Sequence, residues 1–155
     1  MTLAAVLALL VAAPPAAAPE HFFVGRTEGA GTVRMMLSGS HKVRDRSLGR
    51  LDRTGALILE QVVEEEGKPA RRRSWRLVRA GGNRITGTIS DAIGPVSGEV
   101  RGNVIHLRYR AREGNASVEQ WITLHPDGRT GSNRMVFRKF GLKAATLEST
   151  IRKLD

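Results

Sequence analysis

The sequence contains no cysteine. This absence excludes disulfide bonds, zinc sites built from thiolates, a cysteine nucleophile and the lipid-modified cysteine that anchors bacterial lipoproteins. A chain of 155 residues fits one domain plus a short N-terminal extension. A domain of that size buries roughly two thirds of its unfolded surface, so we expect it to fold without covalent cross-links.

Acidic residues are few relative to basic ones. Lys and Arg number 25 against 15 Asp and Glu, which gives a formal net charge of +10. The basic residues form two clusters, at residues 71–73 and at Arg44, Arg46, Arg50 and Arg53. Such clusters favour anionic partners. Aromatic residues make up only 5% of the chain, so few can stack on bases, and a solvated surface is the simpler interpretation.

The first 18 residues contain no ionisable side chain. Residues 3–13 form an unbroken apolar run, which is too short for a membrane-spanning helix of about 20 residues. The run is typical of a secretory signal, and Ala16-x-Ala18 is typical of its cleavage site. We therefore expect residues 1–18 to be a signal segment, residues 19–155 to be a single folded domain, and the protein to be exported.

The folded domain consists of short alternating runs separated by glycine-containing turns. Residues 94–102 place Gly94, Gly98 and Gly102 on one parity with two valines, and polar side chains on the other. Side chains of a strand alternate between its faces, so one face here is small and apolar. Glycines on an inner face indicate a bend, a bulge or room for a bulky neighbour or a ligand.

Seven further runs alternate in the same way and predict half-buried strands. They lie at residues 31–37, 57–63, 75–77, 85–89, 105–109, 118–124 and 135–137. Turn signals every ten residues or so favour an antiparallel sandwich or barrel. The apolar residues of segment 144–154 recur at helical spacing instead and predict a terminal helix.

An ordered set of residues resembles a bacterial family. The set is Phe23-x-Gly25, Gly29-x-Gly31, Arg73-x-Trp75, Gly87-x-x-x-Asp91-x-x-Gly94-x-x-x-Gly98-x-x-x-Gly102-Asn103, Tyr109 and Asn133-Arg134-x-x-x-x-Lys139-Phe140-Gly141. Over about residues 22–155 it resembles the family called "domain of unknown function 3833". The resemblance implies a lipocalin-like protein of the periplasm or cell envelope of a Gram-negative bacterium, with no established activity. We therefore expect a mainly β fold, an antiparallel up-and-down barrel of about 8 strands with a C-terminal helix.

Asp91 continues the inward parity of Ile85 and Gly87. A carboxylate that faces an apolar interior needs a partner. Two interpretations stay open: a ligand anchor or acid–base group, and an aspartate that caps a turn at the strand end. Arg134 is a second candidate, which either neutralises Asp91, holds an anionic group of a ligand, or ties the last strand to the helix.

Trp75, Tyr109 and Trp121 are candidates for lining a ligand pocket, together with Gly87 and Gly98. Parity places Trp75 and Tyr109 inside the barrel. Trp121 is ambiguous, because its apolar neighbours occupy the opposite face. Such aromatic residues either line a site or simply fill the core of a barrel.

No residue pattern indicates a metal site, a cofactor or a catalytic nucleophile. The four histidines are His21, His41, His106 and His125. None has metal-like spacing to another histidine or an acid, so a surface position is expected for them. No serine lies in a Gly-x-Ser-x-Gly elbow, and Gly29-x-Gly31 lacks the third glycine of a dinucleotide loop.

Three functions stay open. The favoured one is a non-catalytic barrel that binds an apolar or amphipathic small molecule or a lipid. The second is an interaction protein whose Arg clusters bind anionic lipid or lipopolysaccharide at a membrane surface. The signal-like segment argues against nucleic acid as the partner. The third is an enzyme with Asp91 as acid or base, for which no second catalytic group has a defensible spacing.

Overall fold

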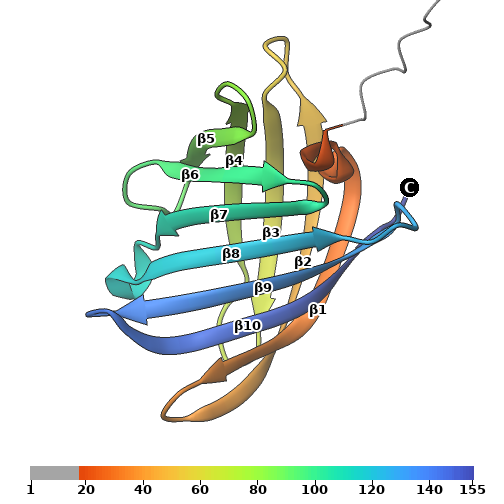
Figure 1. Ribbon diagram of the computed structural model, residues 1–155. Helices are drawn as coiled ribbons and strands as arrows, with labels where there is room; N and C mark the ends of the chain where they lie inside the picture. Colours follow the sequence, from red (N-terminus) through yellow and green to blue (C-terminus); the bar gives the residue numbers. More distant parts are fainter. Residues whose placement is uncertain (1–17) are drawn as a thin grey trace, which may run out of the picture.

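The structure is a computed structural model that describes residues 18–155, so nearly all of the predicted signal segment lies outside the described residues. Ten antiparallel strands form a closed barrel (Figure 1). The first five are β1 (Gly25–Met35), β2 (Gly39–Leu51), β3 (Leu57–Glu65), β4 (Arg71–Arg79) and β5 (Arg84–Ile89). The others are β6 (Val96–Arg101), β7 (Val104–Arg110), β8 (Ser117–Leu124), β9 (Thr130–Lys139) and β10 (Leu142–Lys153). Two short 3-10 helices are η1 (Pro19–Phe23) and η2 (Glu113–Asn115). Within residues 18–155, no helix is long and apolar enough to cross a membrane.

Each strand pairs with its neighbour in sequence, and β1 closes the barrel by pairing with β10. The β1–β10 register runs from Thr27 opposite Lys153 to Met35 opposite Ala145. Closure leaves no free sheet edge that invites pairing with another chain. This arrangement confirms the predicted antiparallel up-and-down barrel, with ten strands rather than about 8.

The predicted C-terminal helix is wrong, because that segment forms strand β10. The residues of β10 that face the interior are Ala145, Leu147, Ser149 and Ile151. These residues repeat with a period of two, but the polar Ser149 interrupts the apolar series. Ala144 adds an apolar residue at a position that does not fit this period, where the β9–β10 register shifts between Lys143 and Ala145. The remaining apolar residues then imitate the spacing of a helix.

Helix η1 covers one end of the barrel. Phe22 and Phe23 are buried there, with their rings in an edge-to-face arrangement at a centroid distance of 5.3 Å. Lys153 Nζ donates hydrogen bonds of 2.7 Å to the carbonyl oxygens of Phe22 and Val24. The hydrophobic core fills the adjoining half of the barrel, with Leu57, Ile105 and other fully buried side chains at its centre. This end is therefore closed.

The glycines of segment 94–102 do not all face the interior, so that prediction is wrong in part. Gly94 and Gly102 are exposed turn residues with φ angles of 74° and 57°, which the turns require. Gly98 is buried in β6, and a Cβ atom there would overlap the carbonyl oxygen of His106 on β7. Gly87 on β5 similarly faces the carbonyl oxygen of Arg76 on β4. These two glycines let strands approach closely at the closed end and lie outside the cavity lining described below.

Candidate ligand-binding cavity

The end of the barrel opposite η1 is hollow. A cavity of about 310 Å³ extends from Trp75 and Tyr109 inside the barrel to Lys68 and Glu113 at its mouth. Small-molecule sites in proteins have volumes of about 300–1,000 Å³, so this cavity lies at the lower end of that range. It has room for one small ligand or for part of a larger one.

Three layers of side chains follow one another from the bottom of the cavity to its mouth. The polar floor consists of Asp45, Gln61, Arg73, Gln120, Asn133 and Ser149. The apolar belt consists of Val33, Val43, Val63, Phe137, Ala145 and Leu147. The charged rim consists of Glu65, Lys68, Arg71, Glu113 and Lys139. The order follows from strand periodicity: on β3, the successive inward residues Gln61, Val63 and Glu65 belong to floor, belt and rim.

Asp45 brings a carboxyl group to the polar floor. Gln61 Nε2 donates a 2.9 Å hydrogen bond to Asp45 Oδ2, and Trp75 Nε1 donates a 3.0 Å bond to Gln61 Oε1. Gly29 lies opposite Asp45 in the β1–β2 register, and a Cβ atom on Gly29 would overlap the carboxylate. Desolvation in the barrel raises the pKa of Asp45, and the hydrogen bond from Gln61 only partly offsets this effect. The site therefore favours the neutral form of this carboxyl group more than water does.

Arg73 joins the floor to the side of the cavity. Its guanidinium binds Asp91 at 2.9 Å, lies within 3.4 Å of the Tyr109 hydroxyl, and has its Cζ atom 5.0 Å from the ring centroid of Trp75. Trp75 and Tyr109 meet edge to face at 5.8 Å. Burial raises the pKa of Tyr109, so its hydroxyl stays neutral and polar beside the cation. Asp91 thus has the partner that an inward-facing carboxylate needs, and it also lies at a strand end.

Gln120 carries a free hydrogen-bonding atom on the floor. Its Nε2 donates to Asn133 Oδ1 at 2.9 Å, and Asn133 Nδ2 donates to Ser149 Oγ at 3.2 Å. Gln120 is only 7% exposed, and within residues 18–155 its Oε1 atom has no hydrogen-bond partner. A buried acceptor without a partner costs about 1–3 kcal/mol. A ligand with a hydrogen-bond donor would remove this cost.

Two predicted site residues lie on the outer wall of the barrel. Trp121 and Arg134 contribute to a shallow surface depression, with the Arg134 Cζ atom 5.8 Å from the Trp121 ring. Trp121 also stacks on His106, with ring centroids 4.8 Å apart. The position of Trp121, ambiguous from the sequence, is therefore on the outside, and neither candidate lies in the interior cavity. Arg134 does not meet Asp91, which pairs with Arg73.

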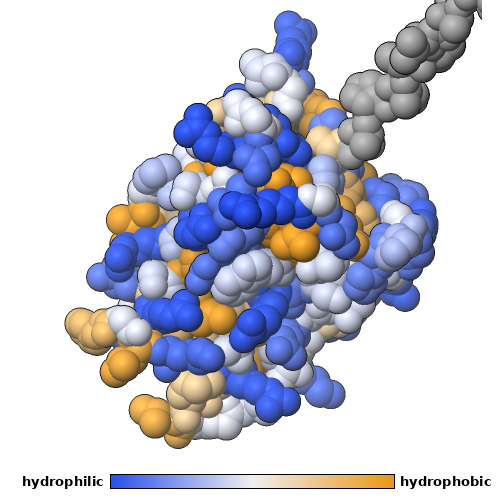
Figure 2. All heavy atoms as spheres, in the orientation of Figure 1, coloured by the Kyte–Doolittle hydropathy of each residue, from blue (hydrophilic) through white to orange (hydrophobic). Residues whose placement is uncertain are grey.

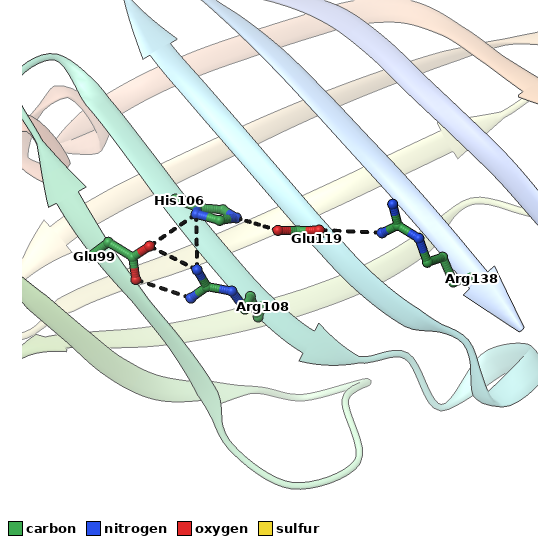
Figure 3. Close-up of polar contacts among 5 residues, drawn as sticks. All are labelled: Glu99, His106, Arg108, Glu119 and Arg138. Atoms are coloured by element: carbon green, nitrogen blue, oxygen red, sulfur yellow. Dashed lines mark hydrogen bonds and ion pairs between the residues drawn. The ribbon is translucent and has the colours of Figure 1, made fainter. Parts of the chain in front are cut away.

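His106 is the centre of a polar network on this outer wall (Figure 3). Its two ring nitrogens contact Glu99 at 3.0 Å and Glu119 at 2.8 Å. Arg108 binds Glu99, and Arg138 binds Glu119. The network ties strands β6 to β9 together from outside, and every acid in it has a basic partner, which indicates a structural role.

The fold divides only one of the two basic clusters. Arg71 and Arg73 point into the cavity, whereas Arg72 between them is exposed on the outside. On β2, Arg44 and Arg46 are exposed, but they approach Glu28 at 4.0 Å and Glu64 at 3.2 Å. Strand alternation therefore divides the first cluster between the cavity and the outer wall. Arg44, Arg46 and Arg50 of the second cluster are all exposed on the outer face of β2, so the second hypothesis stays open.

Comparison with known families identifies the group to which this sequence belongs. The model of the family described as "Protein of unknown function (DUF3833)" matches residues 7–153. The chain belongs to this family. The match confirms the resemblance seen in the glycine and aromatic residues, and no curated protein sequence matches the chain.

Solved structures similar to this DUF3833 chain share its barrel. The S-type phycobiliprotein lyase CPES from Guillardia theta has a TM-score of 0.68 at 10% identity, covering 88% of this chain and 92% of that one. The protein Rv2717c from M. tuberculosis has a TM-score of 0.67 at 15% identity, covering 88% and 95%. At these identities the likeness shows the fold alone, a lipocalin-like barrel.

Three polar residues that line the cavity of this DUF3833 protein were not predicted from the alternation of apolar and polar residues. Asp45, Gln61 and Gln120 face inward, but each is polar and so breaks the apolar series of its strand. A signal was present for Gln120, which stands between Val118 and Ile122 on the inward parity of β8. A polar residue in an inward position of a barrel strand is the pattern that would have identified the floor.

Asp45→Asn is expected to stabilise the protein increasingly as the pH rises. Because the pKa of Asp45 is raised in the folded state, its contribution to stability is greatest at low pH and is lost as the pH rises through the folded pKa. The difference in Tm between the variant and the wild type should therefore grow as the pH rises above about 4, the ordinary pKa of an aspartate. Thermal unfolding followed by circular dichroism measures it.

Asp127→Asn is the matched control with the opposite sign. The backbone N–H of Arg129, with the hydroxyl and N–H of Thr130, lowers the pKa of Asp127. Its stabilising contribution is present above the unfolded pKa and is lost as the pH falls, so this variant should be destabilised more at neutral pH than in acid. An advantage of Asp45→Asn that shrinks as the pH rises would contradict the assignment.

Proposed function

We propose that this DUF3833 protein binds one amphipathic small molecule or lipid in the cavity and catalyses no reaction on it. The polar end of the ligand lies on the polar floor, and its apolar part lies against the apolar belt. The observation that carries the proposal is the layered lining of the cavity, in which polar side chains such as Asp45 and Gln120 lie beneath the valines of the apolar belt.

The layered lining supports an amphipathic occupant over a purely apolar one. A hydrocarbon would cover Asp45 and Gln120 without replacing their hydrogen bonds, which is costly. A fully polar ligand would leave Val33, Val43 and Val63 of the apolar belt in contact with polar groups or water. A hydroxyl or amide group attached to an apolar body satisfies both layers.

The arrangement around Asp91 supports binding over catalysis. Its carboxylate is held by Arg73, and Tyr109 beside it stays neutral because burial raises its pKa. Within residues 18–155, no group of three or more His, Asp or Glu side chains is placed to hold a metal ion. We therefore assign Arg73, Asp91 and Tyr109, which line the cavity, as ligand contacts and not as catalytic groups.

The proposal includes the cellular compartment in which the protein binds its ligand. The apolar run at residues 3–13 and the Ala16-x-Ala18 pattern support export to the periplasm or cell envelope. A fusion of the chain to a reporter that is active only outside the cytoplasm tests this step. Reporter activity that survives deletion of residues 1–18 would contradict it.

Ala145→Phe is expected to abolish binding of an apolar probe, because the added ring fills the cavity between the belt residues. Binding of N-phenyl-naphthylamine, followed by its fluorescence, should weaken by about tenfold or more. Ala30→Phe makes the same change at an exposed position on the outer side of β1 and should leave the affinity unchanged. Leu147→Trp is a second blocking variant, and circular dichroism confirms that each variant is folded.

The polar floor is tested by a pair of ligands that differ in one donor. Decanol should displace the probe about tenfold better than its methyl ether, because only the alcohol donates to Gln120 Oε1. In Gln120→Leu this preference should disappear. Equal affinities in the wild type, or a preference that Gln120→Leu retains, would contradict the proposed orientation.

A further inference from the structure

Two hairpin tips at the open end of the barrel expose large apolar side chains. The β1–β2 hairpin carries Met36 and Leu37, which are 46% and 100% exposed. The β9–β10 hairpin carries Phe140 and Leu142, which are 101% and 74% exposed. Figure 2 shows hydrophobic spheres at the lower left of the molecule, over the tips of these two hairpins in Figure 1. Leu37 and Phe140 bury no surface in the fold, so their packing does not explain why these positions are apolar.

The β9–β10 turn is poorly suited to phenylalanine. Phe140 and Gly141 have φ angles of 53° and 75°, the combination of a two-residue hairpin turn that favours Asn-Gly. A bulky side chain at positive φ is strained, and here no contact compensates the strain. The fold alone therefore does not explain an aromatic residue at this tip.

The two tips are neighbours. β1 pairs with β10, and the backbone N–H of Met36 donates a 3.0 Å hydrogen bond to the carbonyl oxygen of Ala144. Met35 and Lys139, next to the tips, also line the mouth of the cavity. The apolar tips therefore form one surface on one side of the mouth.

Basic residues surround these tips. The hairpin segments 33–43 and 136–146 contain no acidic residue. Their basic residues are Arg34, Lys42, Arg138, Lys139 and Lys143. The acids nearest these tips are already paired: Glu65 contacts His41, Lys68 and Arg71, and Glu66 accepts a 2.9 Å hydrogen bond from the backbone N–H of Lys42. Apolar tips set among cations are the combination by which proteins bind anionic bilayers.

We propose that these two hairpin tips insert into the interface of an anionic phospholipid bilayer, with the mouth of the cavity facing the membrane. A bilayer fits better than a second copy of the chain, because the excess of positive charge around the tips would oppose self-association. A ligand drawn from the bilayer would then enter polar end first, which agrees with a polar floor beneath an apolar belt. Bilayer docking does not depend on which ligand the cavity holds.

Vesicle flotation tests the docking surface. The wild type should bind vesicles of phosphatidylcholine containing about one third phosphatidylglycerol, and bind pure phosphatidylcholine vesicles far less. The triple variant Leu37→Ser, Phe140→Ser, Leu142→Ser should weaken binding by more than about tenfold, because three apolar insertions are lost. Lys139→Gln with Lys143→Gln should weaken binding to anionic vesicles only, and added salt should reproduce that effect.

The matched control removes three exposed apolar side chains elsewhere on the barrel. Leu48, Leu51 and Ile93 are 60%, 40% and 44% exposed, and serine at all three should leave vesicle binding within about twofold of the wild type. Ala145→Phe, which blocks the cavity, should also still bind vesicles. The proposal is overturned if the wild type ignores vesicles, if the tip variant binds like the wild type, or if the tips instead hold a dimer that the triple variant dissociates.

Discussion

Gly98→Ala is expected to destabilise the barrel by about 3 kcal/mol and to lower Tm by about 10 °C. Gly98 is buried on β6, and its missing side chain faces the carbonyl oxygen of His106 on the paired strand β7. A Cβ atom there overlaps backbone, which cannot swing aside as a flexible side chain can. The β6–β7 pair would have to move apart, disturbing Leu107 opposite, which is only 1% exposed. Urea unfolding of the two proteins measures the effect.

Gly102→Ala is the control for this prediction. Gly102 lies four residues further along the same segment, and a Cβ atom on it would meet nothing within 4 Å. Its φ angle of 57° makes alanine cost about 1 kcal/mol through backbone strain alone. The account requires Gly98→Ala to cost clearly more than Gly102→Ala; equal losses would mean that close strand approach is not what Gly98 provides.

Arg73→Ala is expected to cost about 2–3 kcal/mol, the second large effect. The substitution leaves the Asp91 carboxylate and the Tyr109 hydroxyl without their common partner, and removes the cation from the face of Trp75. Water reaches Asp91, whose side chain is 38% exposed, and this keeps the loss below that of a fully buried pair. Chemical denaturation followed by the fluorescence of the two tryptophans provides the measurement.

Arg72→Ala tests whether the position, and not the basic cluster, matters. Arg72 is the neighbouring residue on the same strand, but it points outward and is exposed. Its loss should change the free energy of unfolding by less than about 0.5 kcal/mol. Similar costs for Arg72→Ala and Arg73→Ala would show that overall charge, rather than the contacts within the barrel, stabilises the protein.

The fold was predictable from sequence wherever inward residues are apolar. Runs such as that at 105–109, with Ile105, Leu107 and Tyr109 inside, alternate cleanly because one face meets the core and the other meets water. Prediction failed for β2, whose inward residues include Asp45 and Ser47, and for β10, where Ser149 breaks the series. Each strand contributes a polar side chain to the floor of the cavity, Asp45 on β2 and Ser149 on β10, and this residue interrupts the apolar alternation.

The candidate site was predictable only in part, for the same reason. Trp75, Asp91 and Tyr109 line the cavity, as their parity suggests. The inward parity of Gln120 indicates a polar position in the barrel, but the pattern does not show which of its atoms stay unpaired. The barrel closes by pairing of β1 with β10. This closure decides which strands face each other across the barrel and where the packed core ends and the cavity begins. The sequence of a single segment predicts neither.

The polar floor, the apolar belt and the apolar tips form one sequence of environments along the barrel axis. From the tips inward, a molecule would meet the basic residues beside the tips, the charged rim with Glu65 and Arg71, the valines of the belt, and then Gln120 on the floor. This order matches a lipid taken head first from a membrane surface. The cavity of about 310 Å³ limits the enclosed part to a small head and a short length of chain.

The most direct test of the account is energy transfer from Trp75 to a bound probe. The chain has two tryptophans, and Trp121→Phe leaves only Trp75, which lines the cavity, as the fluorescent donor. Titration of that variant with N-phenyl-naphthylamine should quench Trp75 with a saturable, one-site curve, and Ala145→Phe in the same background should abolish the curve. Quenching that never saturates, or that Ala145→Phe leaves intact, would show that the cavity is not the binding site.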